Sequence, residues 1–168
     1  MCIRDRFYAN KIIDTKLDFD LIFGPAYKGI PLVSSISIAL SNKNINIPFA
    51  FNRKEAKSHG ERGDIIGSEI KDKVLVIDDV ISAGTSINES HNLINLNGGH
   101  MSGVIVAIDR QEKGQNKLSA TQEVAMKYSV PVISIINLED IIAYLESSNR
   151  FKSELALIQS YQKSYGII

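Results

Sequence analysis

The chain has 168 residues, of which 44% are hydrophobic and 23% charged, so it suits one domain with a proper core rather than two. Lysine plus arginine equals aspartate plus glutamate at 19 each, so no basic excess points to nucleic acid or an anionic membrane as partner. The single cysteine, Cys2, excludes an internal disulfide and a cysteine metal site. Neither a membrane span nor a signal peptide is visible, so a reducing cytoplasm is the expected location.

Strands and helices are expected to alternate along the chain. Short apolar segments rich in valine and isoleucine have the pattern of strands that are covered on both faces. The predicted strands are 21–23, 47–51, 74–77, 104–108 and 132–136. Helical periodicity between and after them predicts helices at 30–40, 86–96, 119–128, 138–145 and 151–161.

One of these helices carries explicit end signals. Ser86 and Glu89 have the spacing of a capping box, and Gly98 and Gly99 are expected to end the helix. The whole pattern predicts an α/β fold: a doubly wound, mainly parallel five-stranded sheet with helices on both faces. With no repeat or linker in view, residues 1–168 are interpreted as a single domain.

Polar residues gather where the predicted strands end. In doubly wound sheets ligands bind beyond the carboxyl ends of the strands. Segments of this kind are 24–29, 52–54, 78–86 and 109–110, each directly after a predicted strand. The sequence therefore places the candidate site at this edge of the sheet.

The segment after the third strand is the most unusual. Asp78 and Asp79 directly follow the apolar run 74–77, and the small, hydroxyl-rich loop Ser82–Ser86 leads into a helix. The N–H groups of a first helical turn lack intrahelical partners, so such a loop can bind a phosphate. The two acids could accept hydrogen bonds from a sugar diol or help to hold a cation. The alternative is an ordinary turn with a helix cap and solvated acids.

Two common nucleotide-binding motifs are absent from the sequence. Gly24 and Gly29 have the spacing of a P-loop but lack the lysine and hydroxyl residue that follow it, and no Gly-x-Gly-x-x-Gly occurs. A nucleoside triphosphatase and a dinucleotide-dependent dehydrogenase are therefore disfavoured.

The chain contains four segments, 23–29, 51–61, 74–86 and 109–112, that together resemble the bacterial orotate phosphoribosyltransferases, a family of type I phosphoribosyltransferases. Segment 74–86 is similar to the phosphoribosyl pyrophosphate (PRPP) motif of the superfamily, and segments 23–29, 51–61 and 109–112 narrow the resemblance to the orotate enzymes. The similarity runs from about Phe7 to the end of the chain. It implies transfer of the 5-phosphoribosyl group from PRPP to orotate, which gives orotidine 5′-monophosphate and pyrophosphate in pyrimidine (UMP) synthesis.

The resemblance also implies roles for individual residues. Lys57, His59, Asp78 and Asp79 are implied to be catalytic, and Ser82 and Arg110 to bind orotate. Mg²⁺ is the implied cofactor, held mainly through PRPP rather than by a protein cage. The PRPP-binding residues implied are Tyr27, Lys28, Arg53, Lys54, Lys57, His59, Asp78, Asp79, Val80, Ile81, Ser82, Ala83, Gly84, Thr85 and Ser86.

Simpler interpretations exist for the cations. Lys28 could be an inert surface lysine, and Arg110 could form an ion pair with Asp109 or Glu112. By composition alone, the glycine- and cation-containing segment 54–63 is a solvated loop. By resemblance it is a catalytic loop that closes over pyrophosphate and reaches into a partner's site, which implies a homodimer.

The start of the sequence departs from the family. In the family, a segment before the position of Phe7 covers the base, whereas residues 1–6 resemble nothing in that region. The expectation is a fragment with an unrelated start that still folds and binds PRPP but uses orotate poorly.

Two other functions are compatible with the PRPP motif. A purine-type phosphoribosyltransferase shares the loop Ser82–Ser86, but segment 52–61 argues against it. A PRPP-responsive regulatory protein without turnover could dispense with Lys57 and His59, which are both present here.

Overall fold

The computed structural model describes residues 2–54, 64–115 and 118–167. Lys57 and His59, both predicted to be catalytic, lie outside the described residues. Six strands form one sheet in the order β3-β2-β1-β4-β5-β6, parallel except for β3, which runs antiparallel to β2. The strands are β1 (Leu21–Gly24), β2 (Phe49–Asn52), β3 (Ile65–Gly67), β4 (Asp72–Val80), β5 (Gly99–Asp109) and β6 (Val132–Asn137).

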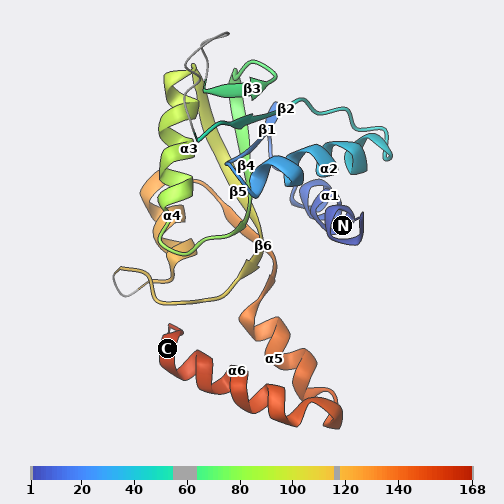
Figure 1. Ribbon diagram of the computed structural model, residues 1–168, viewed down its shortest axis with the longest axis vertical. Helices are drawn as coiled ribbons and strands as arrows, with labels where there is room; N and C mark the ends of the chain where they lie inside the picture. Colours follow the sequence, from blue (N-terminus) through green and yellow to red (C-terminus); the bar gives the residue numbers. More distant parts are fainter. Residues whose placement is uncertain (1, 55–63, 116–117, 168) are drawn as a thin grey trace.

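Helices cover both faces of this sheet (Figure 1). One face carries α1 and α2, and the other carries α3 and α4, while α5 and α6 form a hairpin beyond the end of β6. None of the helices in the described ranges is long and apolar enough to cross a membrane. The helices are α1 (Cys2–Thr15), α2 (Gly29–Ser41), α3 (Thr85–Leu96), α4 (Ala120–Tyr128), α5 (Leu138–Glu146) and α6 (Lys152–Tyr165), with a short 3₁₀ turn at Asn149–Phe151.

Strand β4 shows why both faces must be covered. Val74 and Val76 pack into the apolar cluster under α3 and α4, whereas Leu75 and Ile77 pack into the cluster under α1 and α2. Successive strand side chains point to opposite faces, so a continuous apolar run requires helices on each side. The predicted doubly wound α/β fold is confirmed.

The predicted number of five strands is wrong. The strand that was not predicted is β3, which has only Ile65, Ile66 and Gly67. A strand of three residues is too short to show a hydrophobic period. It pairs with β2 at the sheet edge, where register comes from the partner strand rather than from its own pattern. Helix α1 was not predicted either, although its Tyr8 is fully buried under the sheet.

The end of β4 differs from the sequence prediction in a way that matters for the site. The strand does not stop at Ile77 but continues to Val80, because Asp78 pairs with Val106 and Val80 with Ile108 on β5. The two adjacent acids are therefore the last part of a central strand rather than the first part of a loop. Their backbone is fixed by the sheet ladder on the β5 side.

The capping box predicted for α3 is wrong. The helix begins at Thr85, and Gly84 stands at the N-cap with φ of 72°, without any side-chain cap. Glycine tolerates this left-handed backbone, which a β-carbon would strain. The Ser86 hydroxyl, predicted to cap the helix, donates instead to a side chain at the end of β4.

The turn between β1 and α2 requires glycine at both ends. A β-carbon at Gly24 would lie 2.2 Å from the Gly29 carbonyl oxygen, and one at Gly29 would lie 2.5 Å from the Gly24 carbonyl carbon. Such distances are far inside van der Waals contact, so the chain can fold back here only without side chains. This close turn sets Pro25, Ala26, Tyr27 and Lys28 beside the end of β4.

Candidate active site

A hollow of about 570 Å³ lies beyond the carboxyl ends of β1 and β4. It is the place where the sequence puts the site, since parallel strands leave their connecting loops at one edge. The residues that line it are Pro25, Ala26, Tyr27, Lys28, Lys54, Asp78, Asp79, Val80, Ile81, Ser82, Ala83, Gly84, Thr85, Ser86 and Ile87.

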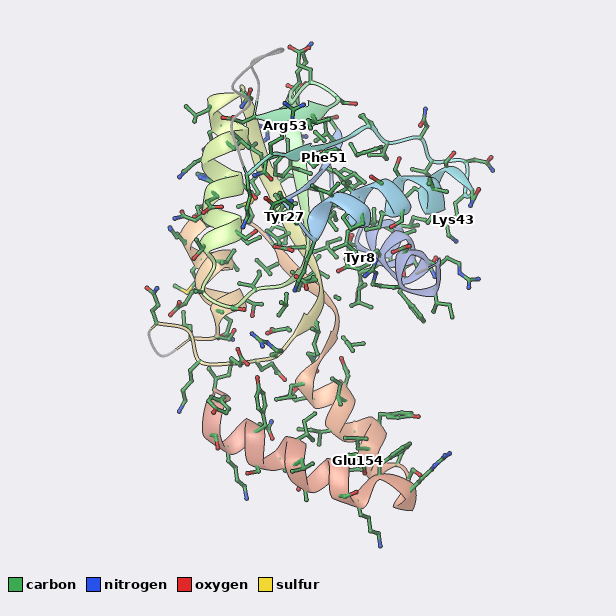
Figure 2. All side chains as sticks on the ribbon, viewed as in Figure 1. Tyr8, Tyr27, Lys43, Phe51, Arg53 and Glu154 are labelled. Atoms are coloured by element: carbon green, nitrogen blue, oxygen red, sulfur yellow. The ribbon has the colours of Figure 1, made fainter. Side chains whose placement is uncertain are left out.

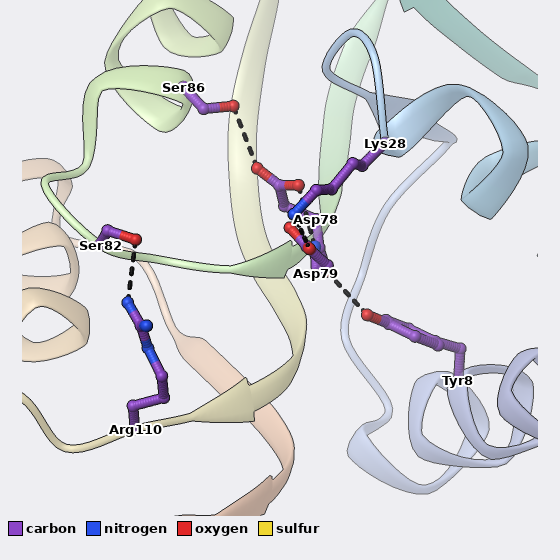
Figure 3. Close-up of polar contacts among 7 residues, drawn as sticks. All are labelled: Tyr8, Lys28, Asp78, Asp79, Ser82, Ser86 and Arg110. Carbon is purple, nitrogen blue, oxygen red and sulfur yellow. Dashed lines mark hydrogen bonds and ion pairs between the residues drawn. The ribbon is translucent and has the colours of Figure 1, made fainter. Parts of the chain in front are cut away.

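Asp78 is buried and its carboxylate is held from two sides (Figure 3). Oδ1 accepts a hydrogen bond from the Asp79 backbone N–H at 2.9 Å, and Oδ2 accepts one from the Ser86 hydroxyl at 3.0 Å. Burial raises the pKa of Asp78 from 3.8 to about 6, although both hydrogen bonds act to lower it. The carboxylate is therefore oriented in the absence of ligand, at an electrostatic cost.

Tyr8 fixes the backbone of the same residue. Its hydroxyl donates to the Asp78 carbonyl oxygen at 2.7 Å, across 70 residues of sequence (Figure 3). Burial raises the pKa of Tyr8 above its ordinary value, so the phenol stays protonated and remains a donor. No sequence pattern indicated this contact, because neither α1 nor its contact with β4 was predicted.

Asp79 forms an ion pair with Lys28 across the mouth of the hollow. The Lys28 Nζ lies 2.6 Å from Asp79 Oδ2, and this hydrogen bond is the main reason that the pKa of Lys28 is raised. The lysine side chain is largely exposed. It is therefore not an isolated surface cation: it belongs to the site and stays protonated there.

The predicted phosphate loop has the geometry of an anion site. Ser82 and Thr85 are exposed, and Gly84 has no side chain to cover its backbone. No side chain at the N-cap accepts a hydrogen bond from the first N–H groups of α3. Those groups and the helix dipole favour a bound anion. Since the Ser86 hydroxyl is engaged by Asp78, it links the loop to the acids instead of blocking the helix end.

Arg110 reaches the loop from the end of β5. Its Nη2 donates to the Ser82 hydroxyl at 3.0 Å and forms an ion pair with Glu112 Oε2 at 2.9 Å. Of the two ion pairs considered from sequence, the one with Glu112 is present; Asp109 instead accepts hydrogen bonds from Gln111 and Thr121. Ser82 and Arg110, which were both predicted to bind orotate, are in contact with each other.

Of the other residues predicted to bind PRPP, Tyr27 and Lys54 line the hollow, whereas Arg53 does not. Lys54 lies over the Tyr27 ring, with Nζ 5.6 Å from the ring centroid, and both line the hollow. Arg53 follows β2 (Figure 2), and its backbone N–H donates to the Asp64 carbonyl oxygen. Arg53 is not among the residues that line the hollow. Ala26 is tied to β2 by a hydrogen bond from its N–H to Asn52 Oδ1 at 2.8 Å.

The chain is similar to known proteins in both sequence and structure. The profile of the phosphoribosyl transferase domain matches residues 3–130. Orotate phosphoribosyltransferase from Alteromonas mediterranea is 48% identical over 163 residues, which is 96% of this chain and 76% of the relative. The enzyme of the same name from Enterobacter sp. strain 638 is 46% identical over 168 residues, covering 99% of this chain and 79% of the relative.

A solved structure agrees with these relatives. The crystal structure of orotate phosphoribosyltransferase from Francisella tularensis superimposes with a TM-score of 0.86 at 37% identity. The match covers 98% of this chain and 79% of that one. The similarity therefore includes α5 and α6 as well as the sheet.

The burial of Asp78 predicts an unusual dependence of stability on pH. The pKa of Asp78 is 3.8 in the unfolded chain and about 6 in the folded protein. The contribution of Asp78 to the free energy of unfolding therefore falls as pH rises between these values and is constant above them. Asp78→Asn keeps the shape and removes the buried charge. We expect it to raise the free energy of unfolding by about 1–2 kcal/mol at about pH 8 and to change it little at about pH 4.

Urea unfolding at the two pH values checks this expectation. Asp79→Asn is the matched control, because it removes a neighbouring carboxylate that is already paired with Lys28. The control should give no stabilisation at about pH 8. An equal effect of Asp78→Asn at both pH values would contradict the assignment of a buried charge.

Proposed function

Since this chain belongs to the orotate phosphoribosyltransferase family, we propose that the hollow beyond β1 and β4 is the place of the family's reaction. In that reaction the 5-phosphoribosyl group of PRPP passes to orotate, in the biosynthesis of pyrimidines. The bond between C1 of the ribose and a pyrophosphate oxygen breaks, and its electron pair leaves with pyrophosphate. A bond forms between C1 and a ring nitrogen of orotate, which loses its proton.

The observation that carries the proposal is that one hollow collects oriented acids, a cation and an open helix end. Asp78 and Asp79 accept hydrogen bonds from the ribose hydroxyls, as carboxylates at the end of β4 can do. The loop Ser82–Ser86 holds the 5′-phosphate on its backbone N–H groups and hydroxyls. Val80, Ile81 and Ala83 contribute backbone to the same binding surface.

The leaving pyrophosphate needs positive charge where its negative charge builds up. Lys28 and Lys54 line the hollow and supply this charge on the β1 and β2 side, and Lys54 lies over the ring of Tyr27. When pyrophosphate is present, the Lys28 ammonium exchanges its contact with Asp79 for phosphate oxygens, which frees Asp79 for the sugar. Arg53, Lys57 and His59 are proposed to act on the same group on the strength of the family resemblance.

Arg110 and Ser82 are proposed to bind the base. Orotate carries a carboxylate and carbonyl oxygens, and a planar guanidinium can donate parallel hydrogen bonds to such a group. The guanidinium lies next to the phosphate loop because it donates to Ser82, so the base and the 5′-phosphate are read by adjoining residues. A purine base lacks the carboxylate, which makes the purine-type alternative less suited to this site.

Phosphoribosyltransferases generally use Mg²⁺ together with PRPP. Within residues 2–54, 64–115 and 118–167, no group of three or more His, Cys, Asp or Glu side chains could hold a metal ion. Mg²⁺ commonly binds through one or two carboxylates plus substrate phosphates and waters. Asp78 and Asp79 therefore fit an ion that arrives with PRPP, and such an ion would offset charge on the departing pyrophosphate.

The chain is further proposed to be a single phosphoribosyltransferase domain of the cytoplasm that acts as a homodimer. In the dimer, residues of the catalytic loop 54–63 would complete the partner's site. The proposal rests on the family resemblance of this segment, since residues 55–63 lie outside the described part of the chain.

A turnover assay with orotate and PRPP tests the proposed site. Orotate should be consumed only when Mg²⁺ is present, and adenine or hypoxanthine should not replace it. The Asp78→Asn/Asp79→Asn double variant should bind PRPP at least about tenfold more weakly in calorimetry. The control is Asp72→Asn, which alters an exposed acid at the opposite end of β4. Unchanged PRPP affinity in the double variant would rule out the assignment of these acids.

Subunit mixing tests the shared site. Lys57→Ala and Asp79→Asn should each be nearly inactive alone. After random subunit exchange, half of the dimers carry one variant of each kind, and each mixed dimer has one intact site of two. About a quarter of wild-type activity should return if the loop acts in the partner's site. Failure to recover activity after exchange is verified would mean that the loop serves its own subunit.

A further inference from the structure

The end of α6 is fastened to the segment that follows Arg110. The Lys113 N–H donates to the Tyr165 carbonyl oxygen at 2.8 Å, and the Ile167 N–H donates to the Gln111 carbonyl oxygen at 3.0 Å. Glu112 and Gly166 form an antiparallel bridge between the same two segments. Figure 1 shows the C-terminal end of α6 returning towards the sheet from the α5–α6 hairpin. The backbone of Glu112 is thus held by a helix that contributes nothing to the hollow.

The Glu112 side chain joins this helix to the candidate base-binding residues. Its Oε1 accepts a hydrogen bond from the Tyr161 hydroxyl, and its Oε2 forms the ion pair with Arg110 Nη2. The same Arg110 nitrogen donates to Ser82 (Figure 3). A continuous line of polar contacts therefore runs from α6 through Glu112 and Arg110 to the phosphate loop.

These contacts restrict side chains that would otherwise be free. Arginine and glutamate are among the side chains that lose the most rotamer freedom when they are ordered. Glu112 can hold Arg110 in one orientation only if Glu112 is itself held, and within the described residues the side chain that does so is Tyr161. The Glu112 side chain is 24% exposed and that of Arg110 is 35% exposed, so solvent screening is incomplete.

One donor of the Arg110 guanidinium is buried and unpaired within the described residues. Nη2 makes its contacts with Ser82 and Glu112, whereas Nε is buried and has no hydrogen-bond partner among the described residues. Buried donors are usually satisfied, but the unpaired Nε does not orient the group, and the contacts of Nη2 are left to do so. Within the described residues, Nη2 contacts Ser82 and Glu112, and Glu112 is in turn held by the hydroxyl of Tyr161.

We propose that Tyr161 is a positioning residue for orotate: through Glu112 it holds the Arg110 guanidinium in the orientation that receives the base. The inference rests on the proposed role of Arg110 and adds Glu112 and Tyr161, which do not line the hollow. Glu112 also neutralises part of the positive charge of Arg110. The hydrogen bond from Tyr161 withdraws electron density from the Glu112 carboxylate and so weakens this neutralisation. The helix at the end of the chain thereby contributes to substrate selectivity.

The test is Tyr161→Phe, which removes one oxygen and keeps the ring. KM for orotate should rise about five- to tenfold, while KM for PRPP and kcat stay within about twofold and the melting temperature barely moves. A merely structural role would change stability or both KM values together. Tyr165→Phe is the matched control, because its ring lies 5.1 Å from that of Tyr161 and its hydroxyl makes no hydrogen bond within the described residues. It should behave as wild type.

Two further variants separate the possible failures. Adding Tyr161→Phe to a Glu112→Ala background should raise KM for orotate no further, since the contact that transmits the effect is already absent. Arg110→Ala should raise KM for orotate more than Tyr161→Phe does. If Arg110→Ala leaves this KM unchanged, the proposed base-binding role of Arg110 is wrong. If Arg110→Ala raises it and Tyr161→Phe matches Tyr165→Phe, only the positioning role is wrong.

Discussion

The arrangement of the candidate site depends on a carboxylate that is buried at the end of a central strand. Asp78 is held by its own ladder partner on β5, by the Ser86 hydroxyl on α3 and, through its carbonyl, by Tyr8 on α1. These contacts come from both faces of the sheet, so each layer of helices contributes to the orientation of one residue. Burial disfavours the ionised carboxylate, which the hydrogen bonds only partly offset. The fold thus gives up some stability to hold this carboxylate oriented before any ligand binds, as its proposed role as acceptor for the sugar requires.

Around this fixed point the other charges are paired, and the pairs differ in how easily they can be exchanged. Lys28 forms an ion pair with Asp79. Arg110 donates a hydrogen bond to Ser82 and forms an ion pair with Glu112. The Lys28 pair is exposed enough that water screens it, so the proposed exchange of Asp79 for substrate phosphate would cost little. By contrast, Arg110 is tied through Glu112 to Tyr161 on α6 and is harder to displace. This difference suits the proposed roles, because a leaving group requires charge that can move to it, whereas recognition of a base requires a donor that stays in place.

The sequence was sufficient to predict the layers and the edge of the sheet where the site lies, because apolar runs such as Val74–Ile77 can be covered only on both faces. It was not sufficient where long-range partners decide the outcome. The spacing of Ser86 and Glu89 matches a capping box, but in the folded chain the Ser86 hydroxyl donates to the Asp78 carboxylate instead. Ser119 and Gln122 do form such a box on α4, and sequence spacing alone does not distinguish the two cases. The contacts of Tyr8 with Asp78 and of Tyr161 with Glu112 join residues 70 and 49 positions apart, and no local pattern encodes them.

The central claim is that Asp78 is buried, oriented and charged only at a cost. A carboxyl ¹³C NMR titration of Asp78 in the ligand-free protein measures this directly. The pKa should be about 6, and it should rise further in Ser86→Ala because a hydrogen bond to the ionised form is lost. Saturation with PRPP should lower it, since sugar hydroxyls would then donate to the carboxylate. A ligand-free pKa near the ordinary value of 3.8, unmoved by Ser86→Ala, would contradict the account.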